Sequence, residues 1–439
     1  MVWYRNEYSH KFETTMGVKQ GALLSPLFFT LFINDIEDDL IGGININRNK
    51  IKLLAFADDI AVIALDPVEL QYNIHVLEKY CLKWNLKINT NKSKVMVCRN
   101  GARPSNKERW SLGNENIEIV NCYKYLGLRI TPQLNLNKHL NDKLLKAKIG
   151  LNSVWKSFIA NSKIPVSAKL EMFNAVSRAI MCYGAQVSGG KSYRQGEQLF
   201  TYFIKKLLRL PRNTPNYIIT LETNMPPLYI HTLQLHHNYI IKVLSMPNYR
   251  YPKIVALETI KRQIYWYKDL CNVNSENGSI IKINFDNVDD CKKELNLLRE
   301  QIHRNHIEAC IIRAQNSQFS IIYKYLNFSF GDESFYFCDK YTTDNISWII
   351  KIRGELLNLN YKRYNSNESQ VCSLCSREEI ENIIHFICIC PAYRDLRLKF
   401  LNKIILSQQE LIQYLNGDWI SLFNYTKRAW ILRYQKIHN

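Results

Sequence analysis

The stretch that decides the fold runs from Ile51 to Ala64 and reads IKLLAFADDIAVIA. Runs of aliphatic and aromatic residues flank the adjacent aspartates Asp58 and Asp59, a pattern that predicts two short strands joined by a tight turn. Two neighbouring carboxylates disfavour each other's ionisation unless a cation or water meets them. At the tip of a hairpin, a divalent metal ion can bind their oxygens. An isolated pair of aspartates is more often a polar turn between buried strands. The neighbouring motifs have to decide between this interpretation and a metal-binding pair.

A second motif, GVKQGALLSP, precedes the hairpin at residues 17–26. Gly17 and Gly21 have no side chains, so a base pair or a nucleotide can approach the backbone there. Ser25 followed by Pro26 predicts a helix that Ser25 caps and that contains Pro26 in its first turn. The next apolar residues recur at helical spacing and predict one apolar face, made of Leu27, Phe28, Leu31 and Phe32.

Three further segments follow the hairpin. Residues 66–69, Asp-Pro-Val-Glu, predict a capping box at the start of a helix. Its apolar stripe is expected to pack against the sheet and consists of Leu70, Ile74, Leu77, Cys81 and Trp84. Residues 84–97 then predict a basic turn that leads into a strand, and residues 123–127 read YKYLG.

This ordered set resembles the palm of the reverse transcriptases of LINE-type, jockey-like non-LTR retrotransposons. The segment at residues 17–26 is similar to the family's motif B, and residues 56–59 are similar to motif C. Residues 89–94 match motif D, and residues 123–127 match the primer-grip motif E. One such motif is weak alone, whereas four in the family's order form a specific signal. A group II intron or LTR-type polymerase fits less well, because alanine rather than methionine precedes Asp58.

The resemblance implies two-metal nucleotidyl transfer from a deoxynucleotide triphosphate to a DNA primer on an RNA template. It implies that Asp58 and Asp59 bind Mg²⁺ and that Lys92 serves the leaving pyrophosphate. Gln20 and Gly21 are expected near the template and nucleotide. The implied primer grip consists of Tyr123, Tyr125, Leu126 and Gly127.

One departure from the family's pattern concerns motif A. Family members have a further metal-binding aspartate upstream of motif B, and no aspartate precedes Gly17 in this sequence. We expect the family's fingers region to be missing from these residues as well. We therefore expect a C-terminal portion of a retrotransposon polymerase that is inactive as it stands. The alternative is a non-catalytic remnant that binds nucleic acid and zinc.

Composition agrees with a nucleic-acid partner. The chain has 439 residues, 58 lysines and arginines against 39 aspartates and glutamates, and a net charge of +19. Such a positive excess suits a phosphate-rich ligand, although dispersed basicity is common. The sequence has no signal peptide and no apolar run of membrane-spanning length. We expect an intracellular protein without a membrane partner, and the resemblance implies a nuclear one; the 12 cysteines should then be reduced or bound to metal.

The predicted fold class is α+β, with a partial polymerase palm of antiparallel sheet and helices, a helical thumb and a helical C-terminal region. We expect the palm at residues 1–128 and thumb helices at 129–190, the second helix at about 167–182. A mainly helical connector of unknown role is expected at 191–350, although the polar residues 271–278 predict a loop within it. A zinc knuckle is expected at 351–400 and a helical tail at 401–439.

The knuckle rests on a spacing of cysteine and histidine residues. Cys372 and Cys375 form a Cys-x2-Cys pair, and His385 and Cys390 follow as candidate third and fourth ligands. Cys388 could replace Cys390 on spacing alone. The resemblance favours Cys390, because family members have His-x4-Cys in this position. Such a site, filled by four protein ligands, predicts a structural Zn²⁺ rather than a catalytic one. Histidines 236, 237, 303 and 306 lack a second ligand pair nearby, which argues against a metal site there.

Overall fold

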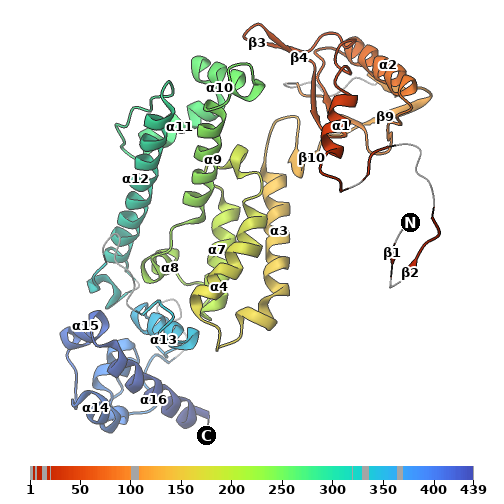
Figure 1. Cartoon of the computed structure of the whole chain (residues 1–439). Coiled ribbons are helices and arrows are strands. Elements are labelled where there is room, and N and C mark those ends of the chain that lie inside the picture. Colours follow the sequence, from red (N-terminus) through yellow and green to blue (C-terminus); the bar gives the residue numbers. More distant parts are fainter. Residues whose placement is uncertain are drawn as a thin grey trace. The chain divides into compact units, whose positions relative to one another are not determined.

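The structure is a computed structural model that describes residues 3–4, 7–11, 17–19, 21–99, 108–318, 320–328, 336–362 and 369–438. The chain divides into two compact units (Figure 1). Unit 1 consists of Met1–Leu136 and Asn248–Glu258, and unit 2 consists of Asn137–Pro247 and Thr259–Asn439. Unit 1 therefore contains the strands and unit 2 is helical.

Unit 1 combines small sheets with the helices Ser25–Phe32 and Pro67–Lys83 and with the first part of a third helix, Tyr251–Arg262. Four antiparallel pairs are β1–β2, β3–β4, β5–β6 and β10–β11, and the mixed sheet β7–β9–β8 contains one parallel pair. The strands are β1 (Trp3–Tyr4), β2 (Glu7–Tyr8), β3 (Ile44–Ile46), β4 (Asn49–Ile51), β5 (Leu53–Phe56), β6 (Asp59–Val62), β7 (Lys94–Val95), β8 (Trp110–Leu112), β9 (Glu115–Ile119), β10 (Tyr123–Tyr125) and β11 (Leu128–Ile130). The mixed α/β character that the sequence predicts is confirmed, and one strand pair is parallel where only antiparallel pairing was expected.

Helix α2 (Pro67–Lys83) packs on two sides in unit 1. Leu77 and Tyr80 pack against the cluster around Leu53, which includes the strand β6. Ile74 packs with Val95 and Trp110 of the mixed sheet. The predicted core stripe is thus confirmed at its centre, while Trp84 at the end of the helix is 38% exposed.

The start of α2 differs in part from the predicted capping box. The Asp66 carboxylate accepts hydrogen bonds from the backbone N–H groups of Val68 and Glu69, as an N-cap should. The Glu69 carboxylate, however, accepts from the N–H groups of Gly43 at 2.8 Å and Leu65 at 3.1 Å. The glutamate therefore anchors a distant loop onto α2 instead of closing the capping box.

Helix α1 (Ser25–Phe32) contains Pro26 in its first turn, as predicted, but Ser25 is not its cap. Leu24 is the N-cap residue, and the Ser25 hydroxyl donates to the carbonyl of Lys19 at 2.6 Å. This bond closes the preceding turn, which competes with capping for the same hydroxyl. The predicted apolar face is exposed along its length, and Phe32 makes an edge-to-face contact with Trp84.

Unit 2 is built from helices, and α10 is divided between the units, its first part up to Glu258 belonging to unit 1 and its end to unit 2. The helices are α3 (Asn137–Ser153), α4 (Val166–Phe173), α5 (Ala179–Met181), α6 (Ala185–Ser188), α7 (Arg194–Leu207), α8 (Asn216–Thr223), α9 (Leu228–Leu244), α10 (Tyr251–Arg262), α11 (Tyr265–Glu276), α12 (Val288–Gln315), α13 (Thr343–Arg353), α14 (Arg394–Leu401), α15 (Gln408–Asn416) and α16 (Trp419–His438). Within the described residues, none of these helices is long and apolar enough to cross a membrane.

Helices α3, α4, α5 and α7 pack together in the first part of unit 2. The π-helical turn η2 (Asn174–Arg178) joins α4 to α5, so residues 166–181 are helical throughout, close to the predicted second helix. Phe173 stacks on Phe203 of α7 with ring centroids 4.2 Å apart. The loop expected at residues 271–278 is wrong, because α11 continues to Glu276 and exposes its polar side chains to solvent.

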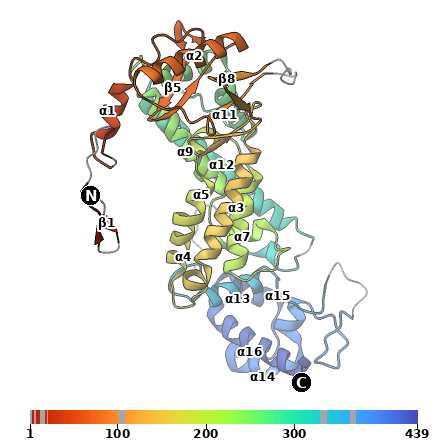
Figure 2. The same ribbon diagram turned by 90° about the vertical axis from the view of Figure 1, so that its right-hand side faces the viewer.

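Helices α13 to α16 form the C-terminal part of unit 2, in which α14 and α16 lie side by side (Figure 2). Trp348 of α13 donates from its indole N–H to the hydroxyl of Thr426 on α16 at 3.0 Å. The helix α16 buries Leu422, Tyr425 and Ala429 completely. The C-terminal helices are therefore packed against one another through α16.

Two histidines of α9 lie in the core of unit 2. His237 is fully buried and His236 is 5% exposed, and the Nε2 atoms of both have no hydrogen-bond partner among the described residues. Burial, assisted by the positive charge of Arg299, lowers the pKa of His237 to about 3. Burial also lowers the pKa of His236. Both rings are therefore neutral in the folded protein near pH 7.

We predict that His237 makes unit 2 acid-sensitive. The unfolded chain gains a proton on this ring below pH 6.5 and the folded protein does not, so stability is full above pH 6.5 and declines toward pH 3. Between pH 6.5 and 5 the free energy of unfolding should fall by about 2 kcal/mol from this residue. Urea unfolding at pH 6.5 and pH 5 should show that the free energy of unfolding depends less on pH in His237→Gln than in the wild type. The exposed His10→Gln should match the wild type, and equal slopes in all three proteins would contradict the prediction.

Candidate catalytic hairpin and metal-ligating cluster

The hairpin β5–β6 carries Asp58 and Asp59 at its tip, as the sequence predicts. Phe56 pairs with Asp59, so Ala57 and Asp58 form a two-residue turn. Ala57 adopts φ = 52°, a left-handed conformation that is uncommon for a residue with a Cβ. Both aspartates are exposed. Their carboxylates therefore stand at the end of a short, tightly turned hairpin, where solvent, a metal ion or a ligand can reach them.

The hairpin β10–β11 contains the predicted primer-grip residues. Leu126 and Gly127 form its loop with φ values of 45° and 80°, and a two-residue loop with both φ values positive matches the right-handed twist of the strands. Glycine suits this conformation, which explains one position of the YKYLG motif by backbone geometry.

The tyrosines of β10 connect three of the predicted motifs. The Tyr125 hydroxyl donates to the carbonyl of Asp59 at 3.4 Å, and the Tyr123 hydroxyl donates to the carbonyl of Lys92 at 3.1 Å. Burial, with the negative charge of Asp59 in second place, raises the pKa of Tyr125. The structure therefore brings together the acidic hairpin, the lysine turn and the primer-grip hairpin.

Hydrogen bonds within the turn fix the backbone of Lys92. The N–H of Lys92 donates to both the carbonyl and the side-chain oxygen of Asn89, at 3.1 and 3.2 Å. The Lys92 side chain is exposed, as are Gly17 and Gly21. At each of these two glycines, a Cβ atom would meet no other atom within 4 Å. The predicted template residue Gln20 lies outside the described residues.

Asp58 and Asp59 supply two carboxylates for a cation. Hard divalent cations prefer such oxygen ligands, so the donor chemistry fits Mg²⁺. Within the residues that the structure describes, no third histidine, cysteine, aspartate or glutamate joins them in a metal-ligating group. The two aspartates alone would supply only part of the ligand shell of a metal ion.

Four side chains in unit 2 form a complete ligand set. One ligand atom from each of Cys372, Cys375, His385 and Cys390 lies within 4.8 Å of the others. The Sγ atoms of Cys372 and Cys390 are 3.9 Å apart, and the Sγ of Cys375 is 3.5 Å from Nε2 of His385. Cys388 is fully buried and does not belong to the group. The structure therefore places Cys390, and not Cys388, beside the other three candidate ligands.

The donor set fits zinc better than a hard cation. Three thiols and one imidazole, all four in reach of one point, are typical of structural Zn²⁺ sites. Burial raises the pKa of Cys372, and it raises the pKa of Cys390 to about 12, so these thiols are neutral without a cation. A bound metal ion reverses this preference, because it stabilises the thiolate form.

Glu379 orients the histidine of this cluster. Its carboxylate is 2.9 Å from Nδ1 of His385, which leaves Nε2 directed at the cysteines. Carboxylates in this position fix the tautomer and the orientation of metal-binding histidines. The backbone supports the arrangement, because the N–H of Cys372 donates to the carbonyl of Glu379 at 2.9 Å.

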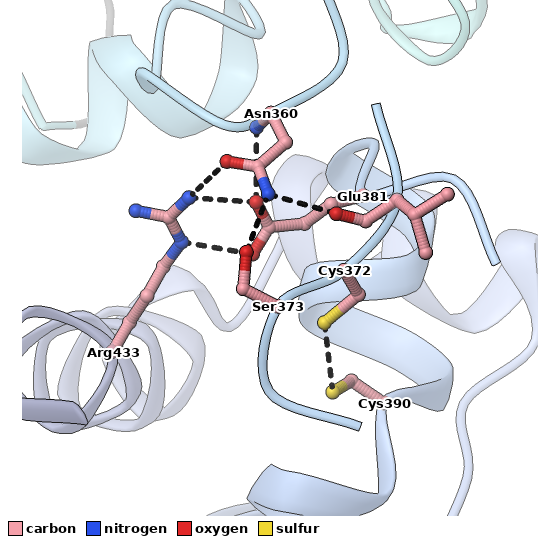
Figure 3. A network of polar contacts seen from close by, with 7 residues as sticks. Asn360, Cys372, Ser373, Glu381, Cys390 and Arg433 are labelled. Carbon is pink, nitrogen blue, oxygen red and sulfur yellow. Dashed lines mark hydrogen bonds and ion pairs between the residues drawn. The ribbon is translucent and has the colours of Figure 1, made fainter. Parts of the chain in front are cut away.

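A buried ion pair ties the cluster region to α16 (Figure 3). Arg433 binds the Glu381 carboxylate at two points, with distances of 2.8 and 2.6 Å. Asn360 accepts from Arg433 at 3.0 Å, and its own amide donates to Val371 and Ser373 next to Cys372. Sequence reasoning missed Glu379, Glu381 and Arg433, because no spacing rule links them to the cysteines.

Comparison with known proteins supports the interpretation of unit 1. Residues 2–130 match the family model described as reverse transcriptase (RNA-dependent DNA polymerase). The chain is 22% identical over 255 residues to the RNA-directed DNA polymerase from mobile element jockey of Drosophila melanogaster, covering 52% of this chain and 27% of that protein. Over this part of its length, the chain is similar to the jockey-type reverse transcriptases.

Further relatives agree with this relationship. The jockey polymerase of Drosophila funebris is 25% identical over 180 residues, which cover 39% of this chain and 19% of that protein. The probable RNA-directed DNA polymerase from transposon X-element of Drosophila melanogaster is 24% identical over 194 residues, or 43% of this chain and 21% of that protein. The resemblance to LINE-type reverse transcriptases is thus confirmed, and the match spans between about a fifth and a quarter of each relative's length.

We predict that Arg433→Met destabilises unit 2 by about 3 kcal/mol, because it leaves the Glu381 carboxylate buried without its partner. Lys191→Met is the matched control, since it removes a lysine from a largely exposed pair with Asp269 and should cost less than about 1 kcal/mol. Chemical denaturation of both variants measures the difference. Equal, small losses of stability would show that the buried pair contributes no more than a surface pair.

Proposed function

We propose that this chain carries the catalytic hairpin and primer grip of an RNA-directed DNA polymerase of a non-LTR retrotransposon. The observation that carries the proposal is the convergence of three motifs, in which the hydroxyls of Tyr123 and Tyr125 bond the backbones of Lys92 and Asp59. All of these residues lie in the segment that matches the reverse transcriptase family. The ligands are an RNA template, a DNA primer and deoxynucleotide triphosphates. Action on chromosomal DNA implies a nuclear location.

The residue roles follow from charge and exposure. Asp58 and Asp59 would hold Mg²⁺, which when bound stabilises charge on the reacting phosphate oxygens. Lys92, exposed on a rigid turn, is suited to neutralise the leaving pyrophosphate. The open space at Gly21 lets a nucleotide or template base approach the backbone. Tyr123 and Tyr125 position the primer-grip hairpin relative to the two aspartates.

Helix α3 lies in the region that we assign to the thumb and supplies lysines to its surface. Lysine ammonium groups lie over aromatic rings at two points, Lys143 over Tyr183 at 4.0 Å and Lys148 over Tyr202 at 5.1 Å. Lys146 on the same helix is about half exposed. Lysines and aromatic rings in this arrangement favour contact with the backbone and bases of nucleic acid.

The cysteine–histidine cluster is proposed to bind one structural Zn²⁺ through Cys372, Cys375, His385 and Cys390. A site that four protein ligands fill contributes folding energy and has no open position for a substrate. We expect this zinc knuckle to order a nucleic-acid-binding element beside α16. A cluster that lies wholly within unit 2 also supports a second candidate function, a non-catalytic nucleic-acid- and zinc-binding protein.

Primer extension distinguishes the two functions. The full chain is incubated with poly(rA), oligo(dT), dTTP and Mg²⁺, beside Asp58→Asn/Asp59→Asn. The matched control Asp38→Asn changes an exposed aspartate of unit 1 outside the hairpin. A polymerase should lose at least about a hundredfold in incorporation in the double variant, because several kcal/mol of charge stabilisation depend on the metal, while template binding persists. Binding without incorporation in all three proteins would agree with the inactivity expected from the sequence and would favour the second candidate.

Metal analysis tests the knuckle. We predict about one Zn²⁺ per chain, lost in Cys372→Ser/Cys375→Ser and retained in Cys388→Ala, which changes a buried cysteine outside the cluster. Glu379→Gln should weaken zinc binding by about 10- to 100-fold, because the histidine loses its orienting carboxylate. Mass spectrometry of the metal content and the thiolate absorption of the Co²⁺ form are the measurements. Full zinc retention in the double serine variant would overturn the assignment.

A further inference from the structure

Unit 2 contains a cavity that the proposed polymerase function does not use. Its volume is about 190 Å³, far more than the roughly 10–15 Å³ that one water molecule needs. Helices α4, α7 and α13 and the π-helical turn η1 (Trp155–Ile159) contribute its walls. Its polar and aromatic lining consists chiefly of Trp155, Lys169, Lys206, Arg209, Thr343 and Asp344.

Lys169 is the residue that gives the cavity its chemistry. Its side chain belongs to the cavity wall although the residue is only 1% exposed. Its ammonium donates to the Thr343 hydroxyl at 2.7 Å, a neutral partner. Burial lowers the pKa of Lys169, and the nearby Asp344 only partly offsets this effect. A buried ammonium without a charged hydrogen-bond partner is costly, and an anion beside it would relieve that cost.

Further positive charges gather around the same space. Arg209 pairs with Asp344 at 3.3 Å, but both side chains of this pair are largely exposed, which makes it a weak and replaceable contact. Lys206 lies 4.0 Å from the ring centre of Trp155. Burial and the charge of Arg209 together lower the pKa of Lys351 on α13. Three cations of the cavity lining, Lys169, Lys206 and Arg209, thus accompany one carboxylate, that of Asp344, an imbalance that favours an added anion.

The start of α13 adds to this field. Thr343 is its first residue, and Thr342 caps it through a hydrogen bond from the N–H of Asn345. The N-terminus of a helix carries a partial positive charge and exposed N–H groups, and it commonly binds phosphate. The helix therefore directs its positive end at the wall that Lys169 reaches.

We infer that this cavity is a phosphate-binding site, in which Lys169 and Arg209 contact the phosphate oxygens and Lys206 lies at the rim over Trp155. Phosphate fits best because it is compact and multiply charged, and because a guanidinium can bind two of its oxygens at once. The competing interpretation is that Lys169 only links α4 to α13 through Thr343. The inference does not depend on polymerase activity, because it rests on residues of unit 2 alone.

Titration of the full chain with inorganic phosphate, at constant ionic strength against chloride, tests the site. Calorimetry and thermal unfolding should show saturable binding and stabilisation. Lys169→Met keeps the length of the side chain but removes the charge, and it should weaken binding at least about tenfold, the factor expected for one charge-assisted hydrogen bond. Lys268→Met, an exposed lysine on α11 outside the cavity, should bind like the wild type.

If Lys169→Met impairs folding, the variant Arg209→Ala still tests the site, because Arg209 is exposed. It should fold normally and also lose about tenfold in phosphate affinity. Unchanged affinity in Lys169→Met or in Arg209→Ala would overturn the inference, as would the absence of saturable binding to the wild type. In that case Lys169 has a purely structural role.

Competition identifies the source of the phosphate. A 5′-phosphorylated oligonucleotide and its 5′-hydroxyl counterpart are added to the phosphate-loaded chain. Displacement by the phosphorylated strand alone identifies a strand end, and equal displacement by both identifies internal phosphodiesters. Displacement by neither identifies a small phosphate compound. Each of these results supports the site only if Lys169→Met loses affinity for the displacing ligand as it does for inorganic phosphate.

Discussion

The register of the hairpin β5–β6 is the constraint on which the candidate catalytic site depends. Leu53 is buried in the cluster that also contains Ile60 and Val62, so these side chains must face the core. A slip of one residue would turn them toward solvent. With the register held, Phe56 pairs with Asp59, and the two aspartates fall at the tip. The position of the carboxylates is thus a consequence of hydrophobic packing several residues away.

The tyrosines of β10 extend this constraint to the other motifs. Each tyrosine uses its hydroxyl to satisfy a backbone carbonyl of another segment, Lys92 in one case and Asp59 in the other. The contacts are made to main-chain atoms, so they position Asp59 and Lys92 without occupying their side chains. The side chains of Asp59 and Lys92 both remain exposed.

In unit 2, buried ion pairs fix the positions of distant segments, a role that strand register has in unit 1. Glu381 and Arg433 join the metal-ligating region to α16, and Glu222 and Arg353 form a second buried pair between α8 and α13. Such pairs are costly unless each partner is fully bonded, which makes them demanding of geometry. Lys169 differs from both, since its hydrogen-bond partner is a neutral hydroxyl. The cavity beside Lys169 therefore differs from the structural core, where each of these buried charges has a hydrogen-bonded partner of opposite charge.

Much of the candidate site follows from local sequence. The Asp58–Asp59 hairpin, the start of α2 at Asp66 and the Cys372/Cys375 pair are encoded by neighbouring residues, and turns, caps and short spacings are local physics. The resemblance to the LINE-type reverse transcriptases likewise rested on motifs in a linear order. The same local reasoning failed for Ser25 and for residues 271–276. The Ser25 hydroxyl could cap the helix or bond the preceding turn, and the polar residues could form a loop or a solvent-exposed helix.

Only the tertiary structure decided which distant groups meet. It directed Glu69 to Gly43 rather than to its own helix start, and it placed Cys390 beside Cys372 while Cys388 points elsewhere. It also supplied Glu379, Glu381 and Arg433 as partners and placed Lys169 in the wall of a cavity. The physical reason is that these contacts join residues whose separation along the chain carries no periodic signal. Their geometry is set by how the helices pack.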